Sequence, residues 1–131
     1  MPSKDKGESR KDKKMTIEKI KKHVAEFGGM TLRPDGEEAD LKAGYMVSLE
    51  RFGSTVSFEG LDVEKVARYL TIAGKVGAYF GIYRNERKGA DAYDLDISVN
   101  IRSRERAIAK GLAEHQDAIW DCAKGCEISF R

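Results

Sequence analysis

The most regular stretch of the chain is Tyr93-Asp94-Leu95-Asp96-Ile97-Ser98-Val99-Asn100-Ile101, in which apolar and polar side chains alternate without a break. Alternation with a period of two is typical of a strand that buries one face in a core and leaves the other face in water. We therefore expect residues 93–101 to form a central strand, with helices and further strands covering its apolar face.

Three helices are predicted, each preceded by a residue whose side chain can cap it: Thr16, Asp62 and Ser103. The first helix should run to about Phe27, because Gly28-Gly29 follows, and the second should end at Gly74. The third carries Ile108, Gly111, Leu112 and His115 on one face. Glycine inside a helix costs about 1 kcal/mol relative to alanine, so Gly111 indicates a close contact between this helix and the sheet.

Turn residues between apolar runs predict the remaining strands. A hairpin of 31–33 with 37–41 is expected around Pro34-Asp35-Gly36, and a second hairpin of 44–50 with 54–59 around Arg51-Phe52-Gly53. Residues 78–83 should form a strand that a loop, 85–92, joins to the central strand. The last hairpin is expected to pair 118–122 with 126–130. Adjacent strands joined by short turns predict an α+β fold, with a mostly antiparallel sheet and about three helices packed on one face.

The chain has 131 residues, of which 35% are charged and 40% hydrophobic, as expected for one globular domain, here residues 15–131. Residues 1–14 hold six Lys or Arg against three Asp or Glu, a net charge of +3, and no aromatic or β-branched residue. We expect a disordered basic tail there. No apolar run approaches the roughly 18–20 residues of a membrane span, and a cytoplasmic location with free Cys122 and Cys126 is expected.

Two groups of residues have the chemistry of metal ligands. Asp94 and Asp96 point to the same face of the central strand, where Glu50 or Asp121 could join them around Mg²⁺. His115, Cys122 and Cys126, with His23 as a fourth ligand, could hold zinc, or the two cysteines could be neighbouring thiols across the last turn. A solvated sheet face is the alternative for the carboxylates. No phosphate loop, dinucleotide fingerprint or nucleophile elbow is present, and no cofactor is predicted.

Exposed aromatic and charged residues are expected on the polar side of the sheet. If Phe80 and Ile82 face the core, then Tyr79, Gly81 and Tyr83 face outward. The residues predicted to bind a partner are Tyr79, Tyr83, Arg84, Arg87, Asp94 and Asp96. Tyrosine, arginine and mixed charge are typical of a protein-binding surface. The same residues could stack single-stranded bases or could simply cover the sheet edge.

Several segments resemble, in pattern and spacing, small accessory proteins carried by phages and conjugative elements of bacteria. They are residues 44–50, 79–83, 93–98 and 118–121, together with Ala107, Gly111 and Gln116. The resemblance covers about residues 15–130. It implies a non-enzymatic protein that binds a host defence complex, as anti-CRISPR and antirestriction proteins do. The partner would be a host protein or a ribonucleoprotein such as a CRISPR effector, blocked by occlusion of its surface.

Two other functions remain open from the sequence. The basic tail and the first helix could bind nucleic acid through Lys11, Lys13, Lys14, Lys21 and Lys22. Alternatively, Asp94, Asp96 and Glu50 could form the site of a metal-dependent enzyme.

Overall fold

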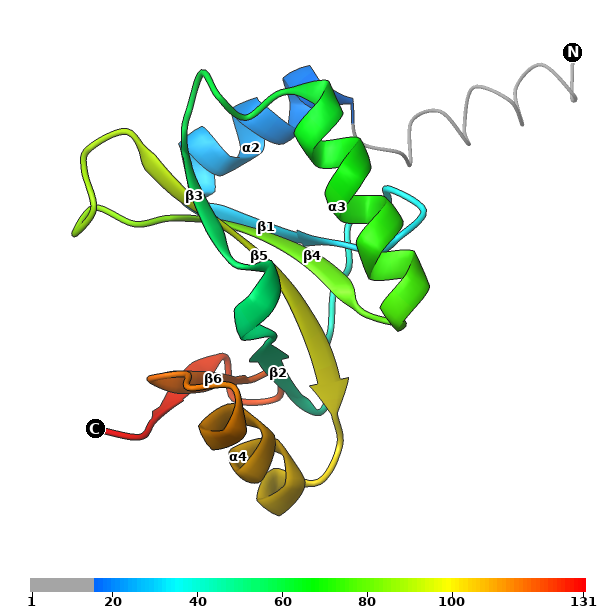
Figure 1. The fold of residues 1–131 in the computed structure, drawn as a ribbon, viewed down its shortest axis with the longest axis vertical. Coiled ribbons are helices and arrows are strands. Elements are labelled where there is room, and N and C mark those ends of the chain that lie inside the picture. Colours follow the sequence, from blue (N-terminus) through cyan, green and yellow to red (C-terminus); the bar gives the residue numbers. More distant parts are fainter. Residues whose placement is uncertain (1–15) are drawn as a thin grey trace, which may run out of the picture.

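The computed structural model describes residues 16–131, so the predicted basic tail, with Lys11, Lys13 and Lys14, lies outside the described residues. Within residues 16–131 the structure has three α-helices and one antiparallel sheet of seven strands (Figure 1). The longest strand is β5 (Ala92–Ile101). The sheet order is β1 (Gly29–Leu32), β4 (Tyr79–Arg84), β5, β2 (Tyr45–Ser48), β6 (Ala118–Asp121) and β7 (Cys126–Ser129), and β3 (Ser54–Ser57) also pairs with β5.

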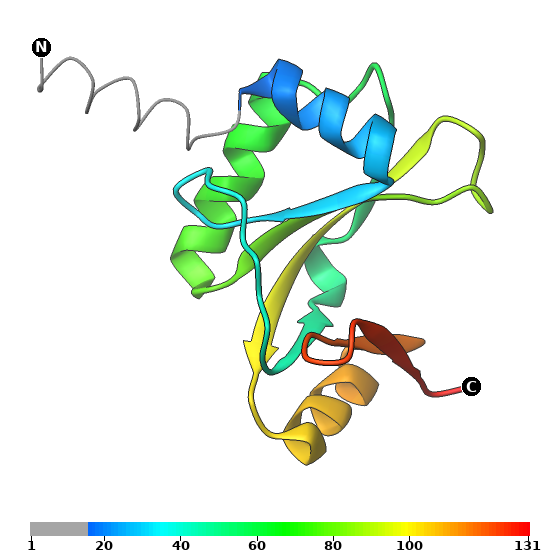
Figure 2. The same cartoon turned by 180° about the vertical axis from the view of Figure 1, so that it is seen from behind.

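The strand predicted at the centre of the fold is confirmed, because β5 pairs with β4 along one edge and with β2 and β3 along the other. Ser98 lies opposite Tyr79 of β4 and Ser48 of β2, and Leu95 lies opposite Ile82 of β4 and Ser54 of β3. Figures 1 and 2 show the sheet bending sharply along β5. As a result β1 and β4 belong to one half of the molecule, and β2, β6 and β7 belong to the other.

The predicted hairpin of 44–50 with 54–59 is wrong. β2 and β3 do not pair with each other; they follow one another along the same edge of β5. A single 3-10 turn, η1 (Glu50–Phe52), interrupts them, and the backbone N–H of Leu49 still donates to the Ile97 carbonyl at 2.8 Å. A tight hairpin needs a left-handed residue at its turn, whereas Gly53 has a φ of −69°.

All three predicted caps are confirmed. The side chains of Thr16, Asp62 and Ser103 accept hydrogen bonds at the first turns of α2 (Ile17–Phe27), α3 (Val63–Val76) and α4 (Arg104–Ala113). The second helix does not end at Gly74. It continues to Val76 and ends at Gly77, whose φ of 66° is left-handed.

The core consists of two clusters on the apolar face of β5. The larger cluster packs Ile20 and Val24 of α2 and Tyr69 of α3 against β1, β4 and the first half of β5. The smaller cluster packs Ala107 of α4 against Val47 and Ile119. The helices therefore cover one face of the sheet, and the predicted α+β fold is confirmed.

In α4 the predicted buried face is only partly correct. Leu112 is 55% exposed, and the helix packs instead through Ala107, Ile108 and Gly111. The predicted reason for Gly111 is confirmed, because a Cβ there would lie 2.7 Å from Cγ2 of Ile119.

Two other turns formed as expected. The backbone N–H of Arg33 donates to the Glu37 carbonyl at 2.8 Å, which closes a short hairpin after β1. β6 and β7 pair around Gly125, whose φ is 64°. None of the helices in residues 16–131 has the length and apolar character to cross a membrane.

Candidate functional site: a cleft on the outer face of the sheet

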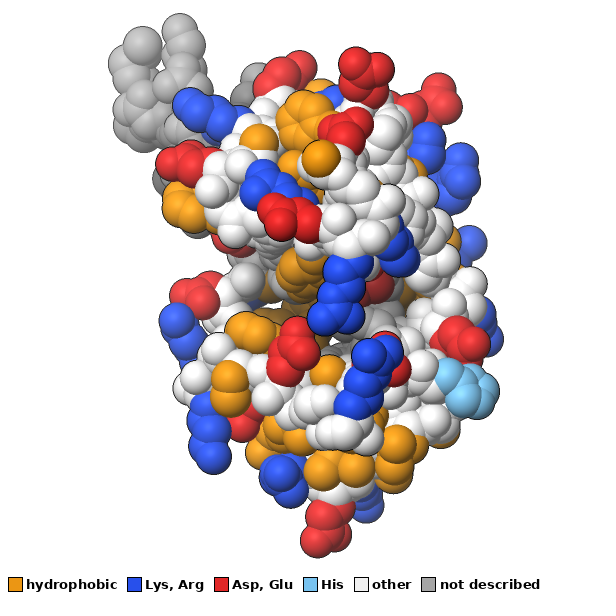
Figure 3. All heavy atoms as spheres, turned by 90° about the vertical axis from the view of Figure 1, so that its left-hand side faces the viewer, with side chains coloured by type: hydrophobic (Ala, Val, Ile, Leu, Met, Phe, Trp, Pro, Cys, Tyr) orange, Lys and Arg blue, Asp and Glu red, His pale blue; other side chains and the backbone are white. Residues whose placement is uncertain are grey.

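The polar face of the sheet is hollowed into a cleft of about 600 Å³, which we call the outer cleft. Its lining includes Phe27, Thr31, Ser48, Tyr83, Asp96 and Trp120. The bend along β5 brings β1 and residues 39–41 to one side of it and β6 to the other. Figure 3 shows the hollow between the two halves of the molecule, with hydrophobic side chains inside it and charges of both signs around its mouth.

Strand register brings the polar residues of the cleft together. Gly81 lies opposite Asp96, Tyr83 lies opposite Asp94, and Tyr79 lies opposite Ser98. Because side chains on directly opposed residues point to the same face, the expectation that Tyr79, Gly81 and Tyr83 share the polar face with Asp94 and Asp96 is confirmed.

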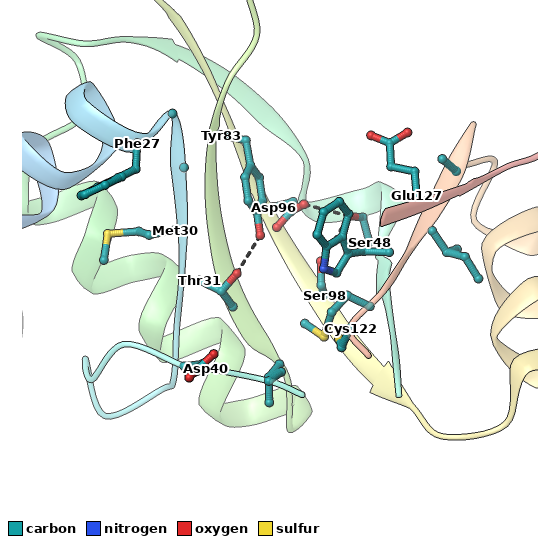
Figure 4. Close-up of a pocket in the computed structure, with 18 residues that line it drawn as sticks. Phe27, Met30, Thr31, Asp40, Ser48, Tyr83, Asp96, Ser98, Cys122 and Glu127 are labelled. Atoms are coloured by element: carbon teal, nitrogen blue, oxygen red, sulfur yellow. Dashed lines mark hydrogen bonds between the residues drawn. The ribbon is translucent and has the colours of Figure 1, made fainter. Parts of the chain in front are cut away.

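Asp96 lies on the floor of the cleft, between Tyr83 and Ser48 (Figure 4). The Ser48 hydroxyl donates to Oδ2 of Asp96 at 2.8 Å and lies 3.1 Å from the Ser98 hydroxyl. Oδ1 of Asp96 has almost no solvent-accessible area and accepts no hydrogen bond from the described residues. Burial raises the pKa of the Asp96 carboxyl above its ordinary value, and the hydrogen bond from Ser48 offsets part of that rise.

Tyr83 forms the wall beside Asp96. Its hydroxyl is hydrogen-bonded to the Thr31 hydroxyl at 2.7 Å, across to β1. The residue keeps 40% of its surface exposed, but its hydroxyl lies inside the cleft. Burial raises the pKa of Tyr83 to about 12, and the nearby Asp96 carboxyl acts in the same direction. The phenol therefore stays protonated near neutral pH and serves as a hydrogen-bonding group.

The charged residues that line the cleft are all acidic: Asp40, Asp96 and Glu127. Large aromatic side chains stand exposed beside them, with Phe27 at 67% and Trp120 at 44%. The cleft thus combines negative charge with apolar surface, a pairing that the chain's overall charge of +2 does not indicate.

The carboxylate of Asp94 already has hydrogen-bond partners on neighbouring residues. It accepts hydrogen bonds from Thr55, Asn85 and Lys88, the last at 2.9 Å. Burial alone would raise the pKa of Asp94, but these hydrogen bonds outweigh it and lower the pKa. Asp94 does not line the cleft.

The other predicted partner-binding residues lie apart from the cleft. Arg84 donates to the Ala25 carbonyl at 2.6 Å and so holds the C-terminal end of α2. Arg87 is exposed in the loop after β4, and Tyr79 is half-buried in β4. Of the six residues, only Tyr83 and Asp96 meet in the outer cleft.

The carboxylates predicted to bind a metal do not come together. Glu50 lies in η1, where its carboxylate is 2.6 Å from Nδ1 of His115. In residues 16–131 there is no group of three His, Cys, Asp or Glu side chains arranged to hold a metal ion. The proposed Asp94, Asp96 and Glu50 site is therefore not formed.

The predicted zinc ligands are also separated. His23 lies 3.6 Å from Glu38, and His115 is paired with Glu50. Cys122 is buried and Cys126 is exposed, both as free thiols. The register places Cys126 opposite Asp121, so the two cysteines do not face each other across the hairpin.

Two lysines of the nucleic-acid hypothesis fall within the described residues. Lys22 is exposed on α2, and the ammonium of Lys21 lies 4.6 Å from the centre of the Phe58 ring. Neither lines the outer cleft.

Residues of the cleft that were not predicted include Phe27, Thr31, Asp40, Ser48, Trp120 and Glu127. Alternation within β5 already placed Ser98 on the face of Asp96. The pairing of β2 with β5 and of β2 with β6 was needed to bring Ser48 and Trp120 to the same place.

No protein-family model, no curated protein and no solved structure matches this chain, so its function has to be inferred from the cleft itself.

Proposed function

We propose that this chain is a non-enzymatic binding protein that engages a partner protein through the outer cleft. The observation that carries this proposal is the exposed Trp120 and Phe27 beside a concave, acidic floor. Tryptophan and tyrosine in a partly desolvated depression are the residues that most often dominate protein–protein affinity. The volume of about 600 Å³ is in the range of pockets that hold a small ligand, so the cleft has room for a side chain of the partner.

The polar groups of the cleft favour binding over catalysis. Tyr83, with a pKa of about 12, stays protonated and does not act as a base, and its hydroxyl is hydrogen-bonded to the Thr31 hydroxyl. Ser48 is bonded to Asp96 with no histidine or lysine in the lining of the cleft. These groups can orient a ligand, and their hydrogen bonds link β4 to β1 and β2 to β5.

The resemblance to phage and mobile-element proteins supplies the specific form of the proposal. The partner would then be a host defence nuclease complex, and the chain would block it by covering a functional surface. Inhibition should be stoichiometric and insensitive to chelators. Inhibition at trace concentrations, through turnover of a substrate, would contradict this form of the proposal.

A photo-crosslinking pull-down tests the binding function. A photoreactive amino acid at Met46, which lines the cleft, is compared with one at Ala109, which is exposed on α4. We expect a bacterial-lysate protein to crosslink from position 46 only, before and after nuclease treatment. Trp120→Ala should lose the capture. Capture that survives Trp120→Ala, or that disappears after nuclease treatment, would contradict cleft-mediated protein binding; the latter favours nucleic acid.

A further inference from the structure

Two carboxylates on the polar face of β5 have opposite surroundings. Asp94 forms an ion pair with Lys88, whose ammonium lies 2.9 Å from Oδ1. Asp96, two residues along the same strand, accepts a hydrogen bond from the Ser48 hydroxyl at Oδ2 and none from the described residues at Oδ1. A buried carboxylate costs free energy unless a charge or enough hydrogen bonds offset its loss of water. Among the described residues, the group that would complete Asp96 is missing.

The lining of the outer cleft defines the missing group. It contains three acids, Asp40, Asp96 and Glu127, and no lysine, arginine or histidine, in a chain with 24 basic residues. A concave site lined by one sign of charge concentrates ions of the opposite sign. The complementary ligand is a cation.

The walls of the cleft distinguish between kinds of cation. Tyr83 and Trp120 both line it and both remain partly exposed, at 40% and 44%. A guanidinium is planar, is more weakly hydrated than an ammonium and stacks on aromatic faces, while its fork of N–H groups matches carboxylate oxygens. Ser98 and the Tyr83 hydroxyl supply further oxygen acceptors near Asp96.

We infer that the outer cleft receives an arginine side chain of the partner protein, whose guanidinium pairs with Asp96 between Tyr83 and Trp120. This inference rests on the proposed binding function and names the chemistry of its anchor. The ring of Tyr83 and Oδ1 of Asp96 lie side by side above Gly81. On entry, the guanidinium therefore moves the Tyr83 ring away from Oδ1. The remaining volume of the cleft accommodates residues on either side of the arginine.

Trp120 makes a direct test possible, because it is the single tryptophan of the chain and it lines the cleft. The full chain is titrated with a short glycine peptide, blocked at both ends, that carries one arginine. The control peptide carries citrulline, which has the same shape without the charge. We expect a saturable change of Trp120 fluorescence with the arginine peptide and at least about tenfold weaker binding of the citrulline peptide.

Matched variants locate the contact. Asp96→Asn should weaken binding of the arginine peptide at least about tenfold, whereas Asp94→Asn, on the same strand face, should leave it unchanged. Thermal unfolding of both variants shows that each is folded. The comparison of arginine with citrulline in the wild-type chain needs no variant at all.

Several results would overturn the inference. They are equal binding of the two peptides, binding that survives Asp96→Asn, and the lack of a saturable change up to about 10 mM peptide. Spermidine binding as tightly as the peptide would show that a small polyamine, not a protein side chain, is the ligand. If a partner captured through position 46 is lost in Trp120→Ala but retained in Asp96→Asn, the proposed function stands and this inference fails.

Discussion

The ring of Tyr83 and the carboxyl group of Asp96 share the space above Gly81. A Cβ at position 81 would collide with Oδ1 of Asp96 and would lie 2.5 Å from the Tyr83 ring. From this point, Tyr83 bonds outward to Thr31 of β1 and Asp96 bonds to Ser48 of β2. Side chains of four neighbouring strands therefore form the floor of the cleft. Among the described residues, Oδ1 of Asp96 has no hydrogen-bond partner there.

Asp96→Asn is predicted to stabilise the protein at about pH 7, by on the order of 1 kcal/mol. Burial raises the folded-state pKa of Asp96, so the folded chain binds that proton more tightly than the unfolded chain. The contribution of Asp96 to stability is then most favourable below the unfolded pKa of about 3.9 and is lost as pH rises through the folded pKa. The substitution removes this loss. Urea unfolding across the acid and neutral range measures it.

Asp94→Asn is the matched control and should have the opposite sign. Hydrogen bonds from Asn85, Lys88 and Thr55 lower the pKa of Asp94 against the effect of burial. Its stabilisation is present above the unfolded pKa and is lost as pH falls through the folded pKa. We expect a loss below about 1 kcal/mol at neutral pH, since the ion pair is partly exposed. Destabilisation by Asp96→Asn equal to that by Asp94→Asn would contradict the difference between the two sites.

Gly111→Ala is predicted to destabilise the chain by about 1–3 kcal/mol, even though alanine is the better helix former. The added Cβ would lie 2.7 Å from Ile119 and 2.8 Å from Phe130, both closer than an ordinary van der Waals contact. Chemical denaturation with circular dichroism measures the change.

Gly74→Ala, in the exposed face of α3, provides the opposite case. Its Cβ meets only Pro34, at an ordinary 3.6 Å. The same substitution should therefore stabilise the protein by about 0.5–1 kcal/mol through helix propensity. Two changes of the same sign would show that contact with the sheet does not decide the outcome at Gly111.

The local parts of the fold were predictable from the sequence. Caps such as Thr16 and Asp62, and the alternation along β5, depend on neighbouring residues alone. The pairing of β2 and β3 was not predictable in this way. Alternation shows that a segment is a strand but not which strand it pairs with, and the 3-10 turn at Glu50–Phe52 kept both strands on one edge of β5.

The site was predictable only in part, for a related reason. The period of two placed Tyr83 and Asp96 on the polar face. It could not show that the sheet bends, and the bend is what brings Trp120 and Phe27 to the same cleft. Arg84 was expected on the binding surface because it follows Tyr83, yet its side chain turns to the other face and contacts α2.

The ion pair between His115 and Glu50 predicts a pH-dependent contribution to stability. The hydrogen bond that His115 donates to the Glu50 carboxylate raises the pKa of His115 in the folded chain. The contribution is fully present below the unfolded pKa of about 6.5 and is lost as pH rises through the folded pKa. His115→Asn should lower the unfolding midpoint more at about pH 6 than at about pH 9. Asparagine suits this position because His115 has a left-handed φ of 55°.

Glu50→Gln should produce the same pH dependence of the unfolding midpoint. At about pH 6, the double variant should have a midpoint no lower than that of either single variant. Both partners are exposed, at 77% and 58%, so the effect should also shrink in high salt. A loss that is the same at both pH values would mean that the histidine ring acts through packing rather than charge.

Arg84→Gln is predicted to lower stability without weakening partner binding through the cleft. The guanidinium donates to the carbonyls of Ala25 and Val24, at the C-terminal end of α2, where the helix dipole favours a cation. Arg87→Gln is the control, because among the described residues no hydrogen bond or ion pair from its side chain is seen, and it should leave the unfolding midpoint unchanged. Thermal unfolding and arginine-peptide titration of both variants separate the two roles. Loss of peptide binding in Arg84→Gln, with the midpoint unchanged, would return Arg84 to the binding surface and contradict its assignment to α2.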